Sequence, residues 1–159
     1  MTAIRFALWE NDSRYAPAKA HADDACYDLL ARSYSLPESL AGESPVLRLP
    51  PGRRCLARTG VFLQLAPGWE ALVRPRSGNA LKLGLTVLNS PGTIDAGYRD
   101  EIGVVLLNAG REELELRAGM KIAQIAFRAI APHLLEPVAR EEFRIDTERG
   151  LGGFGSSGS

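Results

Sequence analysis

Apolar and polar positions along this chain of 159 residues alternate in short runs, with turn-forming residues between them. Turn signals such as Pro50-Pro51-Gly52 and Ala66-Pro67-Gly68 recur at short intervals, which favours an all-β sandwich or barrel. Residues 102–108 are almost continuously apolar, as expected of a strand covered on both faces. The runs predict strands at residues 4–9, 26–31, 45–49, 53–65 (with a break at Thr59-Gly60), 70–74, 102–108, 113–117, 121–131 and 134–139.

One short helix is predicted at residues 77–83, where Gly84 supplies a stop signal. Residues 33–44 are polar and rich in turn formers, so we expect a connection without regular structure. The last ten residues are rich in glycine and serine, a composition typical of a flexible terminus.

Composition limits the classes of protein to consider. The formal net charge is +0, so no overall field attracts nucleic acid or an anionic membrane, and neither is an expected partner. No stretch approaches the roughly 20 apolar residues of a membrane span, and residues 1–5 lack a signal-peptide pattern. With only two cysteines, Cys26 and Cys55, we expect a single-domain cytoplasmic protein with reduced thiols.

Two arginines, a hydroxyl and a glycine precede the predicted helix, in the segment Arg74-Pro75-Arg76-Ser77-Gly78. Backbone amides at a helix N-terminus favour a phosphate, and arginine adds charge-assisted donors. The alternative is structural, with Ser77 as the helix N-cap and the arginines solvated. This segment alone leaves both interpretations open.

Residues 89–101 join two apolar strands, so we expect a hairpin whose backbone donors and acceptors can bind the edge of a base. Asp95 could accept a proton from water or bond a sugar hydroxyl, and Tyr98 could pack flat against a sugar. The alternative is a plain turn in which Asp95 caps the backbone.

Asp28 and Gln124 are polar residues among apolar neighbours, so each needs a partner. Asp28 either pairs with an arginine or helps to order a hydrated metal ion, and Gln124 bonds either a neighbouring strand or a phosphate. The tail at residues 149–158 begins with Arg149 and carries Phe154, so it can wrap an anion and lay a ring on a base. Together these are the parts needed to act on a nucleoside triphosphate.

Five segments resemble, in order and in spacing, the five motifs of the trimeric dUTP pyrophosphatases (dUTPases). The resemblance spans nearly the whole chain, and five motifs in order are far more specific than one glycine-rich motif. The segments are Ala25-Cys26-Tyr27-Asp28-Leu29, Pro75-Arg76-Ser77-Gly78, residues 92–99, residues 119–124 and residues 149–158.

The resemblance implies an all-β, jelly-roll-like distorted barrel with one short helix at residues 1–145. A flexible glycine-rich C-terminal arm at residues 146–159 would complete the active site. It also implies a homotrimer with shared active sites, which hydrolyses dUTP to dUMP and pyrophosphate with Mg²⁺ as cofactor. The protein would thus be a cytoplasmic hydrolase of nucleotide metabolism.

The resemblance also implies a role for each site residue. Asp95 is the catalytic residue, which activates the water that attacks the α-phosphorus and contacts the 3′-hydroxyl. Tyr98 packs under the deoxyribose and excludes a 2′-hydroxyl, and Asp28 supports hydrated Mg²⁺ indirectly, through water. The other residues bind substrate. Asn89 and the backbone near Gly97 recognise uracil, and Phe154 stacks on it. The phosphates are held by Arg76, Ser77, Gly78 and Gln124, and Arg149 reaches the γ-phosphate.

The chain departs from the family pattern at three places. Gly is usual where Asp100 stands, Asp-Arg where Met120-Lys121 stand, and Ser-Ala-Gly where Asp24-Ala25-Cys26 stand. We expect altered packing around Met120, and weaker substrate binding or a changed metal demand from Asp100. Two alternatives stay open: a dCTP deaminase-type relative, revealed by ammonia release from dCTP, and a non-catalytic nucleotide-binding trimer, revealed by binding without pyrophosphate release.

Overall fold

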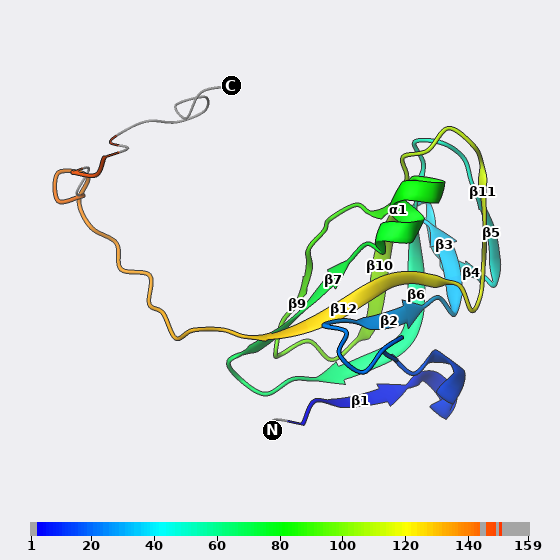
Figure 1. Cartoon of the computed structure of the whole chain (residues 1–159), viewed down its shortest axis with the longest axis horizontal. Coiled ribbons are helices and arrows are strands. Elements are labelled where there is room, and N and C mark those ends of the chain that lie inside the picture. The colour runs from blue at the N-terminus through cyan, green and yellow to red at the C-terminus, as the bar shows by residue number, and fades with distance from the viewer. Residues whose placement is uncertain (1–2, 144–145, 149, 151–159) are drawn as a thin grey trace.

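The structure, a computed structural model, describes residues 3–143, 146–148 and 150. Within these residues the regular secondary structure is mostly β-strand, with one α-helix, α1 (Ser77–Leu83), and the short 3₁₀ helices η1 (Trp9–Asn11) and η2 (Ser13–Tyr15). The predicted all-β class with one short helix is therefore confirmed (Figure 1). In chain order the strands are β1 (Arg5–Leu8), β2 (Tyr27–Leu30), β3 (Ser33–Leu36), β4 (Ser39–Ser44), β5 (Val46–Leu49), β6 (Arg54–Gln64), β7 (Trp69–Arg74), β8 (Leu85–Val87), β9 (Gly92–Ile94), β10 (Glu101–Asn108), β11 (Leu114–Arg117) and β12 (Lys121–Ala129).

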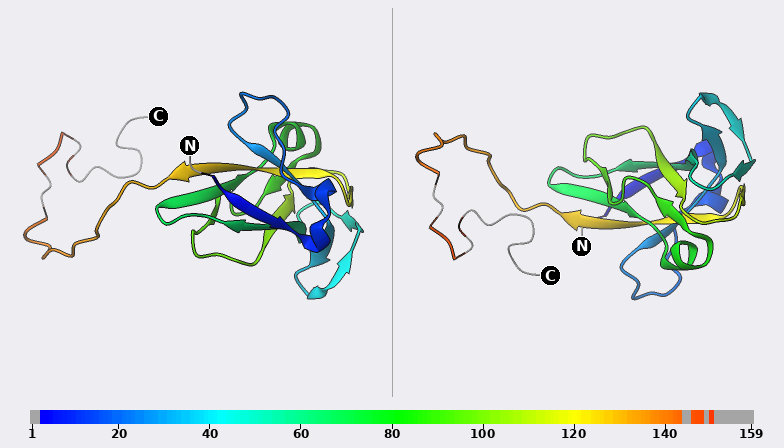
Figure 2. Two further views of the ribbon diagram at one scale, coloured as in Figure 1. Left: turned by 90° about the horizontal axis from the view of Figure 1, so that it is seen from below. Right: turned by 90° about the horizontal axis from the view of Figure 1, so that it is seen from above.

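These strands form three antiparallel sheets. The largest has the order β4-β3-β6-β10-β8, with β1 pairing with β6 outside this path. The second has the order β2-β12-β7-β9, and the third is the pair β11-β5. Across the described part of the chain the sheets stay open and do not close into one barrel, and two further views show how they are layered (Figure 2).

A single hydrophobic core joins the three sheets. Leu29 and Ile125 enter it from the second sheet, Val61 and Leu106 from the largest, and Leu116 from the small pair. All five side chains are buried. Because side chains on a strand alternate between faces, each sheet presents its apolar face to this shared core and its polar face outward.

Strand β6 runs without interruption through the break that the sequence predicts at Thr59-Gly60. The glycine signal instead marks a bend, because Gly60 has a φ of +73° and the pairing with β10 shifts register between Glu101 and Gly103. Between the pairs formed by these two residues β6 has two more residues than β10, and such an irregularity leaves a backbone group without its ladder partner.

Two predicted segments are wrong. Residues 33–44 form β3 and β4 rather than a loop, because Tyr34 is fully buried and its hydroxyl donates to the Arg117 carbonyl at 2.9 Å. Residues 134–139 form no strand: from Ile130 to Phe143 every residue is exposed, and the chain leaves the body as an extended segment (Figure 1). Pro132 and Pro137 cannot donate to a ladder, and no strand among the described residues pairs with this segment.

Helix α1 ends where the sequence predicts. Gly84 takes a left-handed conformation, with a φ of +67°, and its N–H donates to the Ala80 carbonyl at 3.1 Å. The helix end also touches the turn after β10, where a Cβ on Gly84 would lie only 2.5 Å from the Gly110 nitrogen. Glycine at residue 84 therefore both ends the helix and fixes it against the largest sheet.

No helix within the described residues is both long enough and apolar enough to cross a membrane.

Candidate active site

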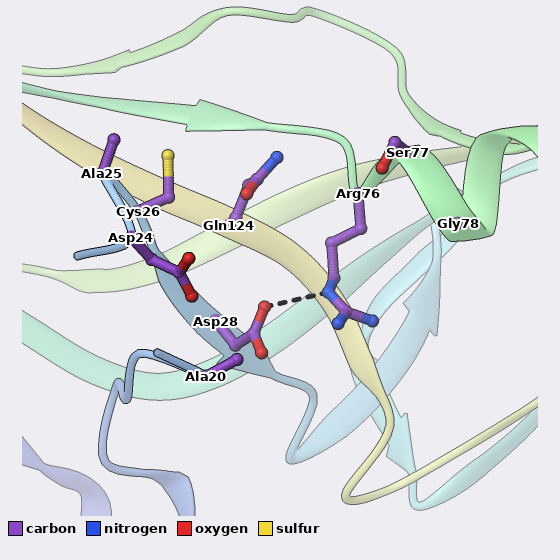
Figure 3. A pocket seen from close by; sticks show the side chains of 9 residues that line it. All are labelled: Ala20, Asp24, Ala25, Cys26, Asp28, Arg76, Ser77, Gly78 and Gln124. Atoms are coloured by element: carbon purple, nitrogen blue, oxygen red, sulfur yellow. Dashed lines mark hydrogen bonds and ion pairs between the residues drawn. The ribbon is translucent and has the colours of Figure 1, made fainter. Parts of the chain in front are cut away.

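A cavity of about 330 Å³ opens where the chain before β2, the start of α1 and strand β12 meet. Strand β12 lies between β2 and β7, and its Gln124 is in register with Asp28 on one side and Arg74 on the other. This pairing brings together residues that are far apart in the sequence. The residues that line the cavity are Ala20, Asp24, Ala25, Cys26, Asp28, Arg76, Ser77, Gly78 and Gln124 (Figure 3).

Asp28 is the buried charge of this cavity. Its Oδ1 accepts a hydrogen bond from Arg76 Nε at 2.9 Å, so the arginine pairing that the sequence left open is present (Figure 3). Lys121 Nζ lies 2.8 Å from Oδ2, in an ion pair that lacks hydrogen-bond alignment. Lys121 was not among the predicted site residues, although its place on β12 beside Leu30 of β2 brings its ammonium group to Asp28.

Gln124 links strand β12 to the start of helix α1. Its Nε2 donates to the Pro75 carbonyl at 2.9 Å, and Asn79 Nδ2 donates back to the Lys121 carbonyl at 2.9 Å. The first bond gives the half-buried Gln124 amide a partner within the protein, and the two bonds together hold the first turn of α1 against β12. Gln124 therefore has a structural partner, but this partner lies in the loop after β7 rather than in a neighbouring strand as predicted.

Ser77 is the first residue of α1, and the N-cap is Arg76, whose side chain makes no capping bond. The interpretation of Ser77 as the N-cap is therefore wrong. Ser77 and Gly78 are both exposed at the edge of the cavity, where the Ser77 hydroxyl is available to a ligand.

A second pocket, of about 170 Å³, lies in the loop region between β8 and β10. The predicted hairpin is more elaborate than expected, since β8 and β10 do pair but the loop adds β9, which pairs with β7. Asn89, Asp95 and Tyr98 contribute polar groups to this pocket, while Gly97 is exposed beside it. The remaining walls are mostly apolar: Val73, Val87, Gly92, Thr93, Ile94, Gly103 and Val104.

A turn at residues 95–98 fixes the backbone around Asp95, because the Tyr98 N–H donates to the Asp95 carbonyl at 3.0 Å. Asp95 is exposed, and among the described residues its carboxylate accepts no hydrogen bond, so the side chain does not cap the backbone. The Tyr98 hydroxyl donates to the Glu101 carbonyl at 2.8 Å. Partial burial, followed by the nearby charges of Asp100 and Glu101, raises the pKa of Tyr98 and keeps this hydroxyl protonated.

The predicted site residues thus fall into two groups within one chain. Asp28, Arg76, Ser77, Gly78 and Gln124 line the first cavity, and Asn89, Asp95 and Tyr98 line the second pocket. The two pockets share no lining residue. Gly97 is exposed and lines neither pocket, and the last two predicted residues, Arg149 and Phe154, lie outside the described residues.

Two departures from the family pattern have local partners. Met120 Sδ accepts a hydrogen bond from the Arg117 N–H at 3.2 Å, in the turn that leads into β12. Asp100 Oδ1 accepts from the Glu101 N–H at 2.7 Å, at the start of β10. Each side chain therefore satisfies a backbone donor near the site, a function that the sequence did not reveal.

Comparison with known proteins adds an independent line of evidence. A dUTPase family model matches residues 13–158. The deoxyuridine 5′-triphosphate nucleotidohydrolase of Gloeothece citriformis is 45% identical over 142 residues, covering 89% of this chain and 88% of that protein. The protein of the same name from Caulobacter vibrioides is 44% identical over 157 residues, covering 98% and 94%. Among solved structures, Staphylococcus bacteriophage 80alpha dUTPase with dUPNHPP is 26% identical, with a TM-score of 0.78 and 100% coverage of both chains.

Proposed function

The chain belongs to the dUTPase family, and on this basis we propose that it is a dUTP diphosphatase that hydrolyses dUTP to dUMP and pyrophosphate. The proposal rests on the charges around the first cavity. There Arg76 and Lys121 both form ion pairs with the buried Asp28 carboxylate, beside the exposed Ser77. A triphosphate carries several negative charges, so its binding requires such a concentration of cations and hydrogen-bond donors.

In this proposal the first cavity holds the phosphates. Asp28 fixes Arg76 through Nε, which directs the terminal guanidinium nitrogens toward phosphate oxygens. The Ser77 hydroxyl, the Gly78 amide and Gln124 supply further contacts along the same wall. Preorganised donors of this kind stabilise the charge that develops on the phosphates during cleavage.

The second pocket holds the nucleoside. Uracil has a donor at N3 and an acceptor at O4, whereas cytosine reverses both, so fixed backbone groups near Asn89 and Gly97 reject cytosine. Tyr98 packs under the deoxyribose and leaves no room for a 2′-hydroxyl. Asp95, with its carboxylate exposed at the pocket, accepts the proton of the water that attacks the α-phosphorus and contacts the 3′-hydroxyl.

The residues present are compatible with a Mg²⁺ ion that arrives with the substrate. The described residues contain no cluster of three candidate ligand side chains, and the Asp28 carboxylate is already paired with two cations. A magnesium ion usually keeps several waters and binds substrate phosphates, so Asp28 would support it through water rather than directly. When bound, the ion neutralises phosphate charge during the attack.

We further propose that the protein is a cytoplasmic homotrimer with active sites shared between subunits. Two observations support this assembly. The predicted site residues line separate pockets within one chain, and residues 130–143 expose large apolar side chains, including Leu134 at 89% and Leu135 at 91%. In this assembly residues 146–159 form an arm that brings Arg149 to the γ-phosphate and Phe154 onto uracil, completing a site built on residues 1–145.

Pyrophosphate release from a panel of deoxy- and ribonucleoside triphosphates, with Mg²⁺, tests the proposed activity. We expect rapid release from dUTP and little from dTTP, dCTP or UTP. Ammonia release from dCTP, or nucleotide binding without pyrophosphate release, would contradict the proposal. Sedimentation equilibrium tests the assembly separately, and a monomer at the concentrations used for the assay would contradict shared sites.

A further inference from the structure

Glu101 is a buried carboxylate that lines neither pocket. Its side chain is 4% exposed, and its Oε1 accepts a hydrogen bond from the Gly60 N–H at 2.6 Å. Gly60 lies at the bulge where the pairing between β6 and β10 shifts register. At the bulge the Gly60 N–H has no carbonyl partner in the ladder, and the Glu101 carboxylate accepts its hydrogen bond instead.

Two arginines hold the same carboxylate. Glu101 Oε2 lies 3.4 Å from Arg32 Nη2 and 3.6 Å from Arg58 Nη1. A second carboxylate, Glu43, lies 2.9 Å from each of the same two guanidinium groups. The four charges balance, and Arg32 also stacks over the Trp9 ring at 4.6 Å, so this arginine is held from several sides.

The backbone of Glu101 connects this cluster to the second pocket. Its carbonyl accepts the Tyr98 hydroxyl at 2.8 Å, and its N–H donates to Asp100 at 2.7 Å. One residue thus carries both the anchor in the sheet and the acceptor that orients the Tyr98 ring. Since Tyr98 is 38% exposed at the pocket, this hydroxyl bond is a principal restraint on where the ring lies.

We propose that Glu101 is a positioning residue that sets the selectivity for deoxyribose over ribose. The inference rests on the proposed function, in which the Tyr98 ring packs under the sugar. A ring held rigidly excludes a 2′-hydroxyl, whereas a ring whose anchor shifts leaves space for it. Sites of this type depend on supporting residues to hold the contacting group within a fraction of an ångström.

The variant Glu101→Gln tests this role because it keeps the size of the side chain and the acceptor for Gly60 but removes the charge that the arginines bind. We expect the ratio of kcat/KM for dUTP to that for UTP to fall at least about tenfold, mostly through faster cleavage of UTP. Tyr98→Phe removes the hydroxyl bond directly and should lower the same ratio. The two changes together should lower it by less than the product of their separate effects, because both loosen one contact.

Glu43→Gln is the matched control. It removes the same charge from the same two arginines but touches neither Gly60 nor Tyr98, so we expect the selectivity ratio to stay at the wild-type value. An unchanged ratio in Glu101→Gln, or an equal fall in Glu43→Gln, would overturn the inference. If Glu101→Gln does not fold, an unchanged ratio in Tyr98→Phe would overturn it. A wild-type protein without any preference for dUTP over UTP would overturn the proposed function itself, so the two failures are distinguishable.

Discussion

Arg76 and Asp28 stand 48 positions apart in the chain, yet Arg76 Nε donates to Asp28 Oδ1 at 2.9 Å across the wall of the first cavity. With Lys121 on the other oxygen, the three side chains carry a formal charge of one positive unit. The carboxylate thus lets two cations lie side by side in a partly buried place, and it also restrains the direction of the guanidinium group. Removal of the carboxylate should therefore have two effects: tighter binding of phosphate groups and slower turnover of the substrate.

We predict that Asp28→Asn binds inorganic pyrophosphate more tightly in the absence of metal. The change leaves two positive units facing the cavity, which should lower the dissociation constant by about three- to tenfold at low ionic strength and less at high salt. The value of kcat for dUTP should nevertheless fall, because Arg76 loses its fixed orientation. Isothermal titration with pyrophosphate in a chelator and steady-state kinetics measure the two effects.

Glu70→Gln is the control for this change, because Glu70 pairs with Arg128 on the surface of the second sheet, away from the cavity residues. It should leave both pyrophosphate binding and kcat unchanged. Weaker pyrophosphate binding by Asp28→Asn would show that the carboxylate does not act by balancing these cations.

Asp95→Asn should preserve substrate binding while removing most of the turnover. The turn at residues 95–98 is held by backbone atoms, so the substituted side chain keeps its place. Loss of a general base typically lowers kcat by about 10²- to 10⁴-fold. The measurement is kcat for dUTP together with the affinity for a non-hydrolysable dUTP analogue.

Asp100→Asn supplies the comparison within the same loop. Its amide oxygen can still accept from the Glu101 N–H, so we expect near-normal kcat despite the lost charge. Near-normal turnover in Asp95→Asn would rule out the catalytic role that we assign to that carboxylate.

Gly84→Ala should destabilise the fold more than an alanine at another glycine with positive φ. A left-handed alanine costs about 1–2 kcal/mol by itself. At residue 84 the added Cβ would also lie 2.5 Å from the Gly110 nitrogen, which forces the backbone to move and adds about 1–3 kcal/mol. Gly52→Ala, at a φ of +72° with no atom within 4 Å, isolates the conformational cost. Urea unfolding compares the two variants, and equal losses would contradict the close packing of helix α1.

The free energy of unfolding should fall above pH 9 because of a buried thiol. Cys55 is 1% exposed, and burial raises its pKa from 9.0 to about 12. The unfolded chain releases this proton first, so the stabilisation is complete below pH 9 and is lost as the pH rises toward 12. One such proton changes the free energy by about 1.4 kcal/mol per pH unit.

Cys55→Ala should therefore show a shallower decline in urea unfolding experiments across this alkaline range. A decline remains in the variant, because burial also raises the pKa of Tyr34. Identical slopes in Cys55→Ala and the wild-type protein would show that the thiol ionises equally readily in the folded and unfolded states.

The sequence predicted elements where local signals and burial agree. The helix at residues 77–83 and its stop at Gly84 follow from local backbone preference, and residues 102–108 follow from their continuous apolar character. Strand β3 was missed because Ser33 and Ser35 suggest a loop, whereas their burial beside Tyr34 is decided by the partner strand β6. Residues 134–139 look like a strand locally but pair with no other strand in the part of the chain that the structure describes.

The candidate site shows the same division. A polar group in an apolar run must meet either a partner or a ligand. The two pockets are lined by seven of the polar residues that we singled out: Asp28, Arg76, Ser77, Gln124, Asn89, Asp95 and Tyr98. Their separation into two pockets depends on strand order, which spacing along the chain does not encode. Lys121 and Glu101 were missed because their partners depend on the register of β12 against β2 and on the bulge between β6 and β10.

The separation of the two pockets has a genetic consequence. If each site draws one pocket from each of two subunits, a chain defective at Arg76 still offers an intact Asp95 loop, and a chain defective at Asp95 still offers an intact phosphate wall. Two inactive variants, one defective at Arg76 and one at Asp95, should therefore regain part of their activity when they are denatured and reassembled together.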